Sequence, residues 1–186
     1  MLKFKRLDIK NFGPFKGEQT IEFPNQDGVT IVYGQNGRGK TTLLNAVRYV
    51  LYGYFITRGS KELEFQKVIN TDALEIGEYE FSVTLVFIYG GNEYELSRIA
   101  KPKTPSKKPK THNDYEQEFF LKRDGIIIPI SDTERVLEQI MPEQVSRFFL
   151  FDGELLQEYE ELVAKESETG RKIKEAIERI LGLPLL

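Results

Sequence analysis

A glycine-rich stretch at residues 34–42 carries the residues with the clearest capacity for chemistry in this chain. It matches the phosphate-binding pattern GxxxxGK[ST], in which glycines let backbone N–H groups approach phosphate closely. In that pattern the Lys40 ammonium contacts the β- and γ-phosphates, and the Thr41 hydroxyl binds Mg²⁺. The stretch therefore predicts a site for ATP and Mg²⁺, formed by Gln35, Asn36, Gly37, Arg38, Gly39, Lys40, Thr41 and Thr42.

The segments on either side of this loop are those that a phosphate site needs. Residues 29–33 are all β-branched or aromatic, and they predict a buried strand. Residues 41–52 place apolar side chains at helical spacing and predict an amphipathic helix. Strand, loop and helix in this order aim backbone N–H groups and a helix N-terminus at phosphate.

An aromatic run that ends in acids, residues 147–154, is the second candidate for chemistry. An ATPase needs carboxylate or amide oxygens near its Mg²⁺ and a group that orients the attacking water. Asp152 is the candidate Mg²⁺ ligand and, with Lys40, the candidate catalytic group. In one interpretation Asp152 ends a metal-binding strand and Glu154 polarises water. In another, Asp152 lies on a loop that reaches the metal from the γ-phosphate side. An ordinary strand end with an Asp-Gly turn is the third.

The remaining pattern predicts strands with few parallel crossovers. Alternating residues predict strands over 2–9 and 20–23, and two glycine turns predict hairpins that join 80–89 to 92–99 and 118–123 to 126–130. Short helical pieces are expected within 53–77, a helix capped by Ser131 or Asp132 runs to Ile140, and residues 145–151 read as strand-like. Helical patterns follow at 154–165 and 170–182. The fold class is therefore α/β with a large antiparallel component.

Composition narrows the class of protein. The sequence has no cysteine, which excludes disulfides and zinc–thiolate sites and fits a reducing cytoplasm. No apolar run is long enough to span a membrane, and the N-terminus leads directly into a strand pattern, so we expect a cytoplasmic protein without a signal peptide or membrane partner. The one histidine, His112, lies in a Pro/Lys segment, where we expect neither catalysis nor metal binding.

A basic tract at residues 101–113 is the candidate surface for a polyanion. Five lysines are interleaved with prolines there, at Lys101, Lys103, Lys107, Lys108 and Lys110. The composition predicts a mobile basic loop between two strands, which could contact duplex DNA through phosphates without sequence preference. A solvated loop that only aids solubility explains the same composition. Residues 1–60 carry a net charge of +5 against −7 for 116–186, which also allows a basic N-terminal face toward ATP or DNA.

The sequence resembles the N-terminal lobe of the SMC/RecF-like ATPases, which are ABC-type heads that act on DNA ends and chromosomes. The matching segments are residues 7–12, the phosphate loop with its flanks at 31–47, and the Ile-Glu-Arg-Ile-Leu-Gly-Leu segment at 177–183. Residues 11–15 and 146–154 are most similar to the ATPase of the DNA phosphorothioation (Dnd) system. The resemblance covers nearly the whole chain.

The resemblance implies a P-loop NTPase fold in which residues 1–186 form one lobe of an ABC/SMC-type head, with helix 170–182 leading toward a coiled coil or C-terminal lobe. Asn36, Gly37, Gly39, Lys40, Thr41 and Thr42 would hold phosphates and Mg²⁺. Asp152 would stand where repair relatives carry the Q-loop glutamine, so that Mg²⁺ must separate its charge from the γ-phosphate. Gly13 stands where repair relatives often carry an arginine, so that contact is not carried over.

The implied activity is ATP binding, with hydrolysis once a C-terminal lobe and a second head complete the site. These are needed because neither a signature motif nor a Walker B strand with its catalytic glutamate follows Asp152. The implied role is support of DNA sulfur modification beside other subunits, without the sulfur chemistry itself since cysteine is absent. A repair or recombination ATPase, and a nucleotide-gated DNA clamp with little turnover, are the alternatives. A GTPase is disfavoured because no Asn-Lys-x-Asp guanine motif is present.

Overall fold

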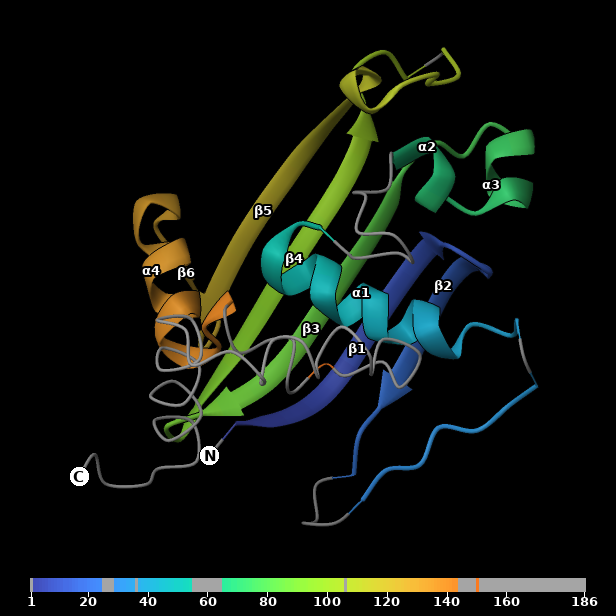
Figure 1. Cartoon of the computed structure of the whole chain (residues 1–186). Coiled ribbons are helices and arrows are strands. Elements are labelled where there is room, and N and C mark those ends of the chain that lie inside the picture. The colour runs from blue at the N-terminus through green and yellow to red at the C-terminus, as the bar shows by residue number, and fades with distance from the viewer. Residues whose placement is uncertain are drawn as a thin grey trace, which may run out of the picture.

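The computed structural model describes residues 2–24, 29–35, 37–54, 65–105, 107–143 and 150 (Figure 1). These residues form one antiparallel sheet whose six strands are ordered β2-β1-β3-β4-β5-β6. Its strands are β1 (Lys3–Phe12), β2 (Phe15–Glu22), β3 (Phe81–Tyr89), β4 (Asn92–Pro102), β5 (Tyr115–Arg123) and β6 (Ile126–Ile128). The helices are α1 (Lys40–Tyr52), α2 (Phe65–Val68), α3 (Thr71–Glu75), the 3₁₀ helix η1 (His112–Asp114) and α4 (Ile130–Ile140).

The sheet has one apolar and one polar face because its side chains alternate. Leu85 of β3 stands opposite Leu7 of β1 and Leu96 of β4, and all three are fully buried. Helix α1 lies across this face, over β1, β3 and β4, and α4 packs against β5 (Figure 1). The opposite face carries polar pairs such as Thr84 Oγ1 with Ser97 Oγ at 2.8 Å. The core is therefore a single layer between the sheet and the helices α1, α2 and α4.

An aromatic cluster joins α1 to the sheet and to α2. The ring centroids of Phe12 and Tyr49 lie 5.7 Å apart, and Phe65 meets Phe81 edge-on at 5.4 Å. Tyr115 from β5 meets Phe65 at 5.7 Å. Burial raises the pKa of Tyr115 to about 12, with a further contribution from the neighbouring charge of Asp114. Edge-on and tilted pairs of this kind contribute about 0.5–1.5 kcal/mol each beyond the area they bury.

Asn11, at the end of β1, is fully buried and joins three segments. Its Nδ2 donates to Glu78 Oε2 at 3.0 Å and to the Glu80 carbonyl at 3.3 Å, and its Oδ1 accepts from the Gly17 N–H at 2.8 Å. Its own carbonyl accepts from the Asn70 N–H at 2.8 Å. Its φ of 49° lies in the left-handed region, which asparagine tolerates better than most residues. The Asn11 side chain therefore fixes the β1–β2 turn against the segments before β3.

Most of the elements predicted from the pattern are confirmed. Both glycine hairpins form, with Gly90-Gly91 and Asp124-Gly125 all at positive φ, and α1 spans the predicted helix. Short helices α2 and α3 lie within 53–77. The predicted caps of α4, Ser131 or Asp132, are wrong. The helix begins at Ile130 after Pro129 and has no side-chain cap. The fixed φ of Pro129 suits a helix entry, and its carbonyl accepts from the Asp132 and Thr133 N–H groups.

The predicted buried strand at residues 29–33 is wrong for this structure. These residues form no strand, and Val29, Ile31 and Tyr33 are 88%, 76% and 90% exposed. A strand with apolar residues on both faces needs neighbouring strands and covering layers. Among the described residues no strand pairs with this segment. The predicted segments at 145–149 and 151–182, including Asp152 and Glu154, lie outside the described residues.

No helix among the residues described has both the length and the apolar character needed to cross a bilayer.

Replacing Asn11 tests its part in the fold. We expect Asn11→Ala to lower the free energy of unfolding by about 2–3 kcal/mol, because the Gly17 N–H and the Glu78 carboxylate lose their partner inside the protein. Urea denaturation measures the loss. Asn11→Gly removes the same bonds without strain at positive φ, so it should show most of the effect. Asn92→Ala is the control, since Asn92 makes only a weak 3.5 Å bond to the Gly90 carbonyl. Equal losses in Asn11→Gly and Asn92→Ala would contradict this role.

Candidate nucleotide-binding site

The glycine loop runs directly into α1 in this structure. Gly37 and Gly39 have φ of 77° and 94°, values that favour glycine, and Gly39 is the N-cap residue of α1. The Arg38 N–H donates to the Gln35 carbonyl at 3.3 Å and closes a turn within the loop. The predicted residues Gln35, Gly37, Arg38, Gly39, Lys40, Thr41 and Thr42 thus share one loop and the first helical turn, while Asn36 lies outside the described residues.

The Lys40 side chain folds back over the loop that precedes it. Its Nζ donates to the Gly34 carbonyl at 2.7 Å and to the Gln35 carbonyl at 3.0 Å. These carbonyls are neutral acceptors, and they hold the ammonium against the loop. An ammonium held there by neutral groups is suited to exchange them for a phosphate, which is a stronger, charged acceptor.

The N-terminus of α1 has the features of an anion site. No side chain caps it, and no acidic residue lies in its first turn. The first N–H groups of a helix lack intrahelical partners, and the helix dipole adds positive potential at the same end. Thr41 is exposed in this first turn. The uncapped terminus and the exposed Thr41 hydroxyl fit the phosphates and Mg²⁺ of a nucleotide.

The turn between β1 and β2 supports this end of α1, which the sequence did not predict. A Cβ added to Gly13 would lie 2.6 Å from Thr42 Cγ2, and one added to Gly39 would lie 3.0 Å from Pro14 Cγ and 3.1 Å from Phe15 Cζ. Each of the two glycines therefore packs directly against side chains of the other segment, where a Cβ would collide. A Gly-Pro pair such as Gly13-Pro14 typically marks a turn, but its contact with the loop cannot be read from the sequence, because β2 and residues 23–33 separate the two segments.

The acids predicted to serve the metal are not placed by the structure. The residues that it describes contain no group of three His, Cys, Asp or Glu side chains able to hold a metal ion. Leu150, two residues before Asp152, is described and buried. Its carbonyl accepts a hydrogen bond from Nη2 of the buried Arg48, two turns along α1 from Lys40. The chain that leads to Asp152 is thus attached to the same helix that begins at the phosphate loop.

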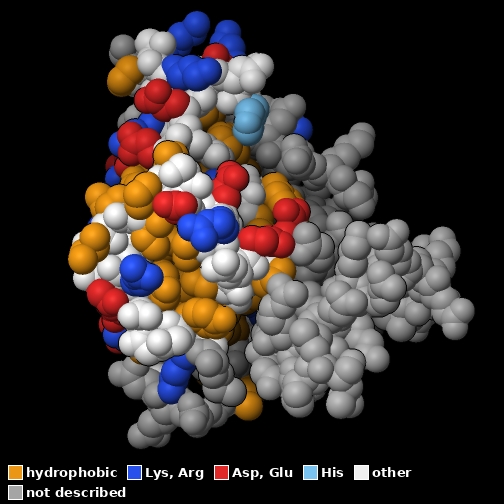
Figure 2. Space-filling view, turned by 90° about the vertical axis from the view of Figure 1, so that its left-hand side faces the viewer, with side chains coloured by type: hydrophobic (Ala, Val, Ile, Leu, Met, Phe, Trp, Pro, Cys, Tyr) orange, Lys and Arg blue, Asp and Glu red, His pale blue; other side chains and the backbone are white. Residues whose placement is uncertain are grey.

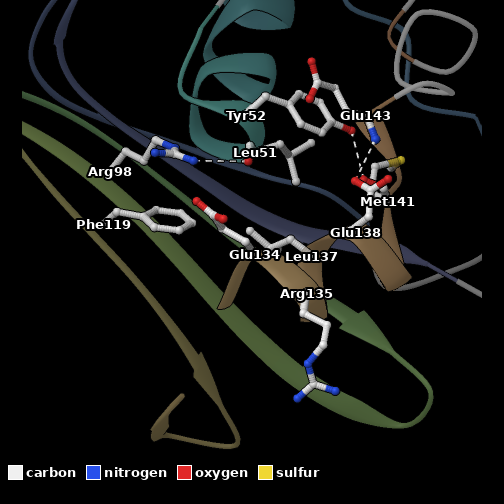
Figure 3. Close-up of a pocket in the computed structure, with 10 residues that line it drawn as sticks. All are labelled: Leu51, Tyr52, Arg98, Phe119, Glu134, Arg135, Leu137, Glu138, Met141 and Glu143. Carbon is white, nitrogen blue, oxygen red and sulfur yellow. Dashed lines mark hydrogen bonds between the residues drawn. The ribbon is translucent and has the colours of Figure 1, made fainter. Parts of the chain in front are cut away.

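A pocket of about 490 Å³ lies at the other end of α1, between α1, α4 and strands β4 and β5 (Figure 3). Tyr52 donates to the Met141 carbonyl at 3.3 Å across it, and Tyr54 donates to Glu143 Oε1 at 2.5 Å nearby. Figure 3 shows the Glu134 carboxylate turned toward the space between Phe119 and Leu51. Because the 13 residues of α1 span about 20 Å, this pocket is distinct from the phosphate loop.

Arg98 closes the C-terminal end of α1 at this pocket. Its Nε donates to the Val50 carbonyl at 2.9 Å and its Nη2 to the Leu51 carbonyl at 3.4 Å, while its guanidinium lies 3.8 Å from the ring centroid of Phe119 (Figure 3). Burial lowers the pKa of Arg98 to about 10, against opposing contributions from Tyr49 and Glu134, so the group stays charged at neutral pH. A cation at a helix C-terminus stabilises the helix dipole.

A glycine loop with positive φ that opens into an uncapped helix N-terminus, beside a lysine held over the loop, defines a P-loop nucleotide-binding domain. The family model described as "AAA domain" matches residues 6–182, and the chain belongs to this family. The fold is that of an AAA-type P-loop ATPase domain with a six-stranded antiparallel sheet and helices, consistent with the N-terminal lobe of an SMC-, Rad50- or RecF-type head.

Three relatives illustrate the similarity. The chain is 30% identical over 146 residues to the DNA replication and repair protein RecF of Chlorobaculum parvum, covering 77% of this chain and 37% of that protein. It is 30% identical over 98 residues to the DNA double-strand break repair Rad50 ATPase of Archaeoglobus fulgidus, covering 53% of this chain and 10% of the other. It is 24% identical over 204 residues to the SbcC component of the nuclease SbcCD of Staphylococcus saprophyticus, covering 94% and 19%. The chain thus spans well under half the length of these relatives.

The contact between Gly13 and Thr42 can be tested with a matched pair of substitutions. Gly13 and Gly17 have φ of 57° and 65°, but an added Cβ meets Thr42 only at Gly13 and meets nothing within 4 Å at Gly17. We expect Gly17→Ala to cost about 1–2 kcal/mol of stability from backbone strain alone. Gly13→Ala should cost about 1–3 kcal/mol more and should also weaken nucleotide binding, because Thr42 must shift.

Urea denaturation and calorimetric titration with a Mg²⁺–ATP analogue measure the two effects. If Gly13→Ala and Gly17→Ala bind the nucleotide equally well, the β1–β2 turn does not position the phosphate loop.

Proposed function

We propose that this chain is the nucleotide-binding N-terminal lobe of an SMC-like ATPase head that acts on DNA. The observation that carries the proposal is the uncapped N-terminus of α1 directly behind the glycine loop, with the Lys40 ammonium folded over that loop. Backbone N–H donors, the positive end of the helix dipole and the Lys40 ammonium lie together there, where they can bind one anion. Family membership over residues 6–182 supports ATP as the ligand.

The residues of the loop divide the work of holding Mg²⁺–ATP. Lys40 exchanges its carbonyl partners, those of Gly34 and Gln35, for phosphate oxygens. The N–H groups of the first turn of α1 would bind phosphate, and the Thr41 hydroxyl would hold Mg²⁺. The metal held there would supply positive charge against the charge that develops on the phosphates during hydrolysis. Asp152 is the proposed acidic partner of the metal, reached by a chain that Arg48 attaches to α1 at Leu150.

The exposed apolar segment at residues 29–33 supports the proposal that a second lobe completes the head. Val29, Ile31, Val32 and Tyr33 are exposed immediately before the phosphate loop. Such a segment gains stability by pairing within a sheet and burying both faces. We propose that strands of a C-terminal lobe of the same ATPase cover it, and that hydrolysis requires this lobe together with a second head. Relatives named for the Rad50 ATPase and the nuclease SbcCD, much longer than this chain, support that division.

The DNA transaction itself has two candidate forms. The relatives named for DNA repair and replication support a repair or recombination ATPase. The motifs at 11–15 and 146–154, through their resemblance to the ATPase of the phosphorothioation system, favour support of DNA phosphorothioation. Deleting the gene and measuring phosphorothioate linkages in cellular DNA separates the two. A clamp with little turnover remains the non-enzymatic alternative, favoured if the complete protein dimerises with ATP but does not hydrolyse it.

Nucleotide binding is tested by calorimetric titration of a non-hydrolysable ATP analogue with Mg²⁺. We expect Lys40→Ala to weaken binding by about 10- to 100-fold, since a charge-assisted contact to phosphate is worth about 1.5–3 kcal/mol. Asp152→Ala should weaken binding less, and only when Mg²⁺ is present. Lys16→Ala is the control, because Lys16 is exposed on β2 outside the loop. If the Lys16 and Lys40 variants bind the analogue equally well, the loop is not the phosphate site.

Hydrolysis is the second test of the proposal. We expect the 186-residue chain alone to hydrolyse ATP at a rate indistinguishable from its Lys40→Ala variant, because the groups proposed for a second lobe are missing from the site. Addition of the C-terminal part of the same ATPase should produce turnover that Lys40→Ala abolishes. Vigorous Lys40-dependent turnover by the chain alone would show that the site is already complete.

A further inference from the structure

The connection between β4 and β5, residues 103–114, projects from the end of the sheet (Figure 1). We call these residues the lysine tip, because they hold four exposed lysines: Lys103, Lys107, Lys108 and Lys110. Lys101, which the sequence analysis grouped with this tract, instead lies within β4 and pairs with Glu118 at 2.9 Å. Figure 2 shows Lys and Arg side chains gathered at this end of the molecule.

The backbone of the lysine tip is organised by one carboxylate. Asp114 Oδ2 accepts from the Lys110 N–H at 2.8 Å, from the Thr111 N–H at 2.9 Å and from Thr111 Oγ1 at 3.2 Å. These bonds, led by that from Lys110, lower the pKa of Asp114. The Lys103 N–H donates to the Asp114 carbonyl at 2.8 Å and joins the two ends of the tip. The described part of the tip thus has a defined backbone conformation.

The tip is also attached to the core. The ring of His112 lies 4.1 Å from that of the buried Phe65, measured between centroids, and Pro109 is buried. The His112 ring therefore packs against the aromatic cluster here. Attachment through His112 and Pro109 leaves the four lysine side chains on the outside.

The tip lysines differ from the lysines of the sheet in their partners. On the sheet, Lys5 pairs with Glu93 at 2.5 Å, Lys10 with Glu80 at 3.0 Å and Lys122 with Glu95 at 2.6 Å. By contrast, none of the four tip lysines forms an ion pair with a carboxylate of the described residues. The one carboxylate in the tip, that of Asp114, accepts from two backbone N–H groups and from Thr111 Oγ1, and the nearby charge of Lys107 also lowers its pKa without forming a salt bridge. The tip is therefore a cationic cluster with free donors on a chain whose net charge is −3.

We propose that the lysine tip binds the phosphate backbone of duplex DNA; the inference rests on the proposed function of a head that acts on DNA. Four flexible ammonium groups on one projection suit closely spaced phosphates, which duplex DNA presents at about one charge per 1.7 Å of its axis. The tip has no Phe, Tyr or Trp on which bases could stack, and its exposed His112 ring already lies against Phe65 on one side, so the tip favours contacts to phosphate over base stacking. Contacts to phosphate alone carry no sequence preference.

The salt dependence of binding gives the proposal a quantitative form. Each phosphate neutralised by a lysine contributes about −0.9 to the slope of log K against log salt, so four contacts give about −3.6. Such a slope reduces the affinity by about 10²-fold between about 50 and 200 mM salt.

The experiment compares two variants with equal changes of charge. The tip variant combines Lys103→Gln, Lys107→Gln, Lys108→Gln and Lys110→Gln, and the control combines Lys5→Gln, Lys10→Gln, Lys16→Gln and Lys122→Gln on the sheet. Fluorescence anisotropy of a labelled duplex of about 30 base pairs of random sequence reports binding to the 186-residue chain across about 50–200 mM salt. Thermal unfolding verifies that both variants fold.

We expect the tip variant to lose about 10-fold or more in affinity at low salt and to show a slope flatter by about 0.9 for each lysine that contacts a phosphate, while the control keeps most of the wild-type affinity and slope. Equal binding by the two variants, an absence of DNA binding by the wild-type chain, or displacement of the duplex by polyglutamate at equal charge would each overturn the proposal. Calorimetric titration of the tip variant with the Mg²⁺–ATP analogue should match wild type, so a failure at the tip is distinct from a failure of the nucleotide site.

Discussion

The buried amide of Asn11 is the interaction on which the geometry of the phosphate loop depends. It ties the end of β1 to the Gly17 N–H and to the segment at Glu78 and Glu80, and so fixes the turn that contains Gly13. That turn touches Thr42 and Gly39 with no room for a further carbon atom. The described loop residues Gly34, Gln35, Gly37 and Arg38 are exposed, and the contacts of Gly39 and Thr42 with this turn connect the loop to the polar network around Asn11. A buried polar network that lacks one of its hydrogen bonds is less stable than an apolar core, so residue 11 must be one that makes all of these bonds.

Helix α1 has opposite environments at its two ends. At its N-terminus no side chain caps the free N–H groups, whereas at its C-terminus the Arg98 guanidinium satisfies the carbonyls of Val50 and Leu51. The positive end of the helix dipole is thus open to a ligand, and its negative end is neutralised by Arg98 of β4. Stacking of Arg98 on Phe119 and the bond from Tyr52 to Met141 extend this second contact to β5 and α4.

Sequence patterns predicted the helix and the hairpins whose conformation depends on residues near one another in the chain. Helix α1 follows from its apolar spacing, and both hairpins follow from glycine turns that only positive φ can close. The Gly13–Thr42 contact and the Arg98 contact with α1 could not be predicted, because they join segments far apart in sequence and depend on how α1 crosses the sheet. The strand predicted at residues 29–33 was wrong for a different reason. Their composition is typical of a buried strand, which needs neighbouring strands, and the described residues provide none.

The exposed segment at residues 29–33 also bears on how the protein must be made. An extended, apolar, unpaired segment is a template on which other chains can add as strands, and it carries no charge or proline that would block such growth. During synthesis the N-terminal part of a chain emerges first, at about 5–20 residues per second, and waits with such surface open to water. The longer residues 29–33 stay uncovered, the more the chains self-associate. The soluble yield of the protein therefore depends on how soon the proposed strands cover this segment.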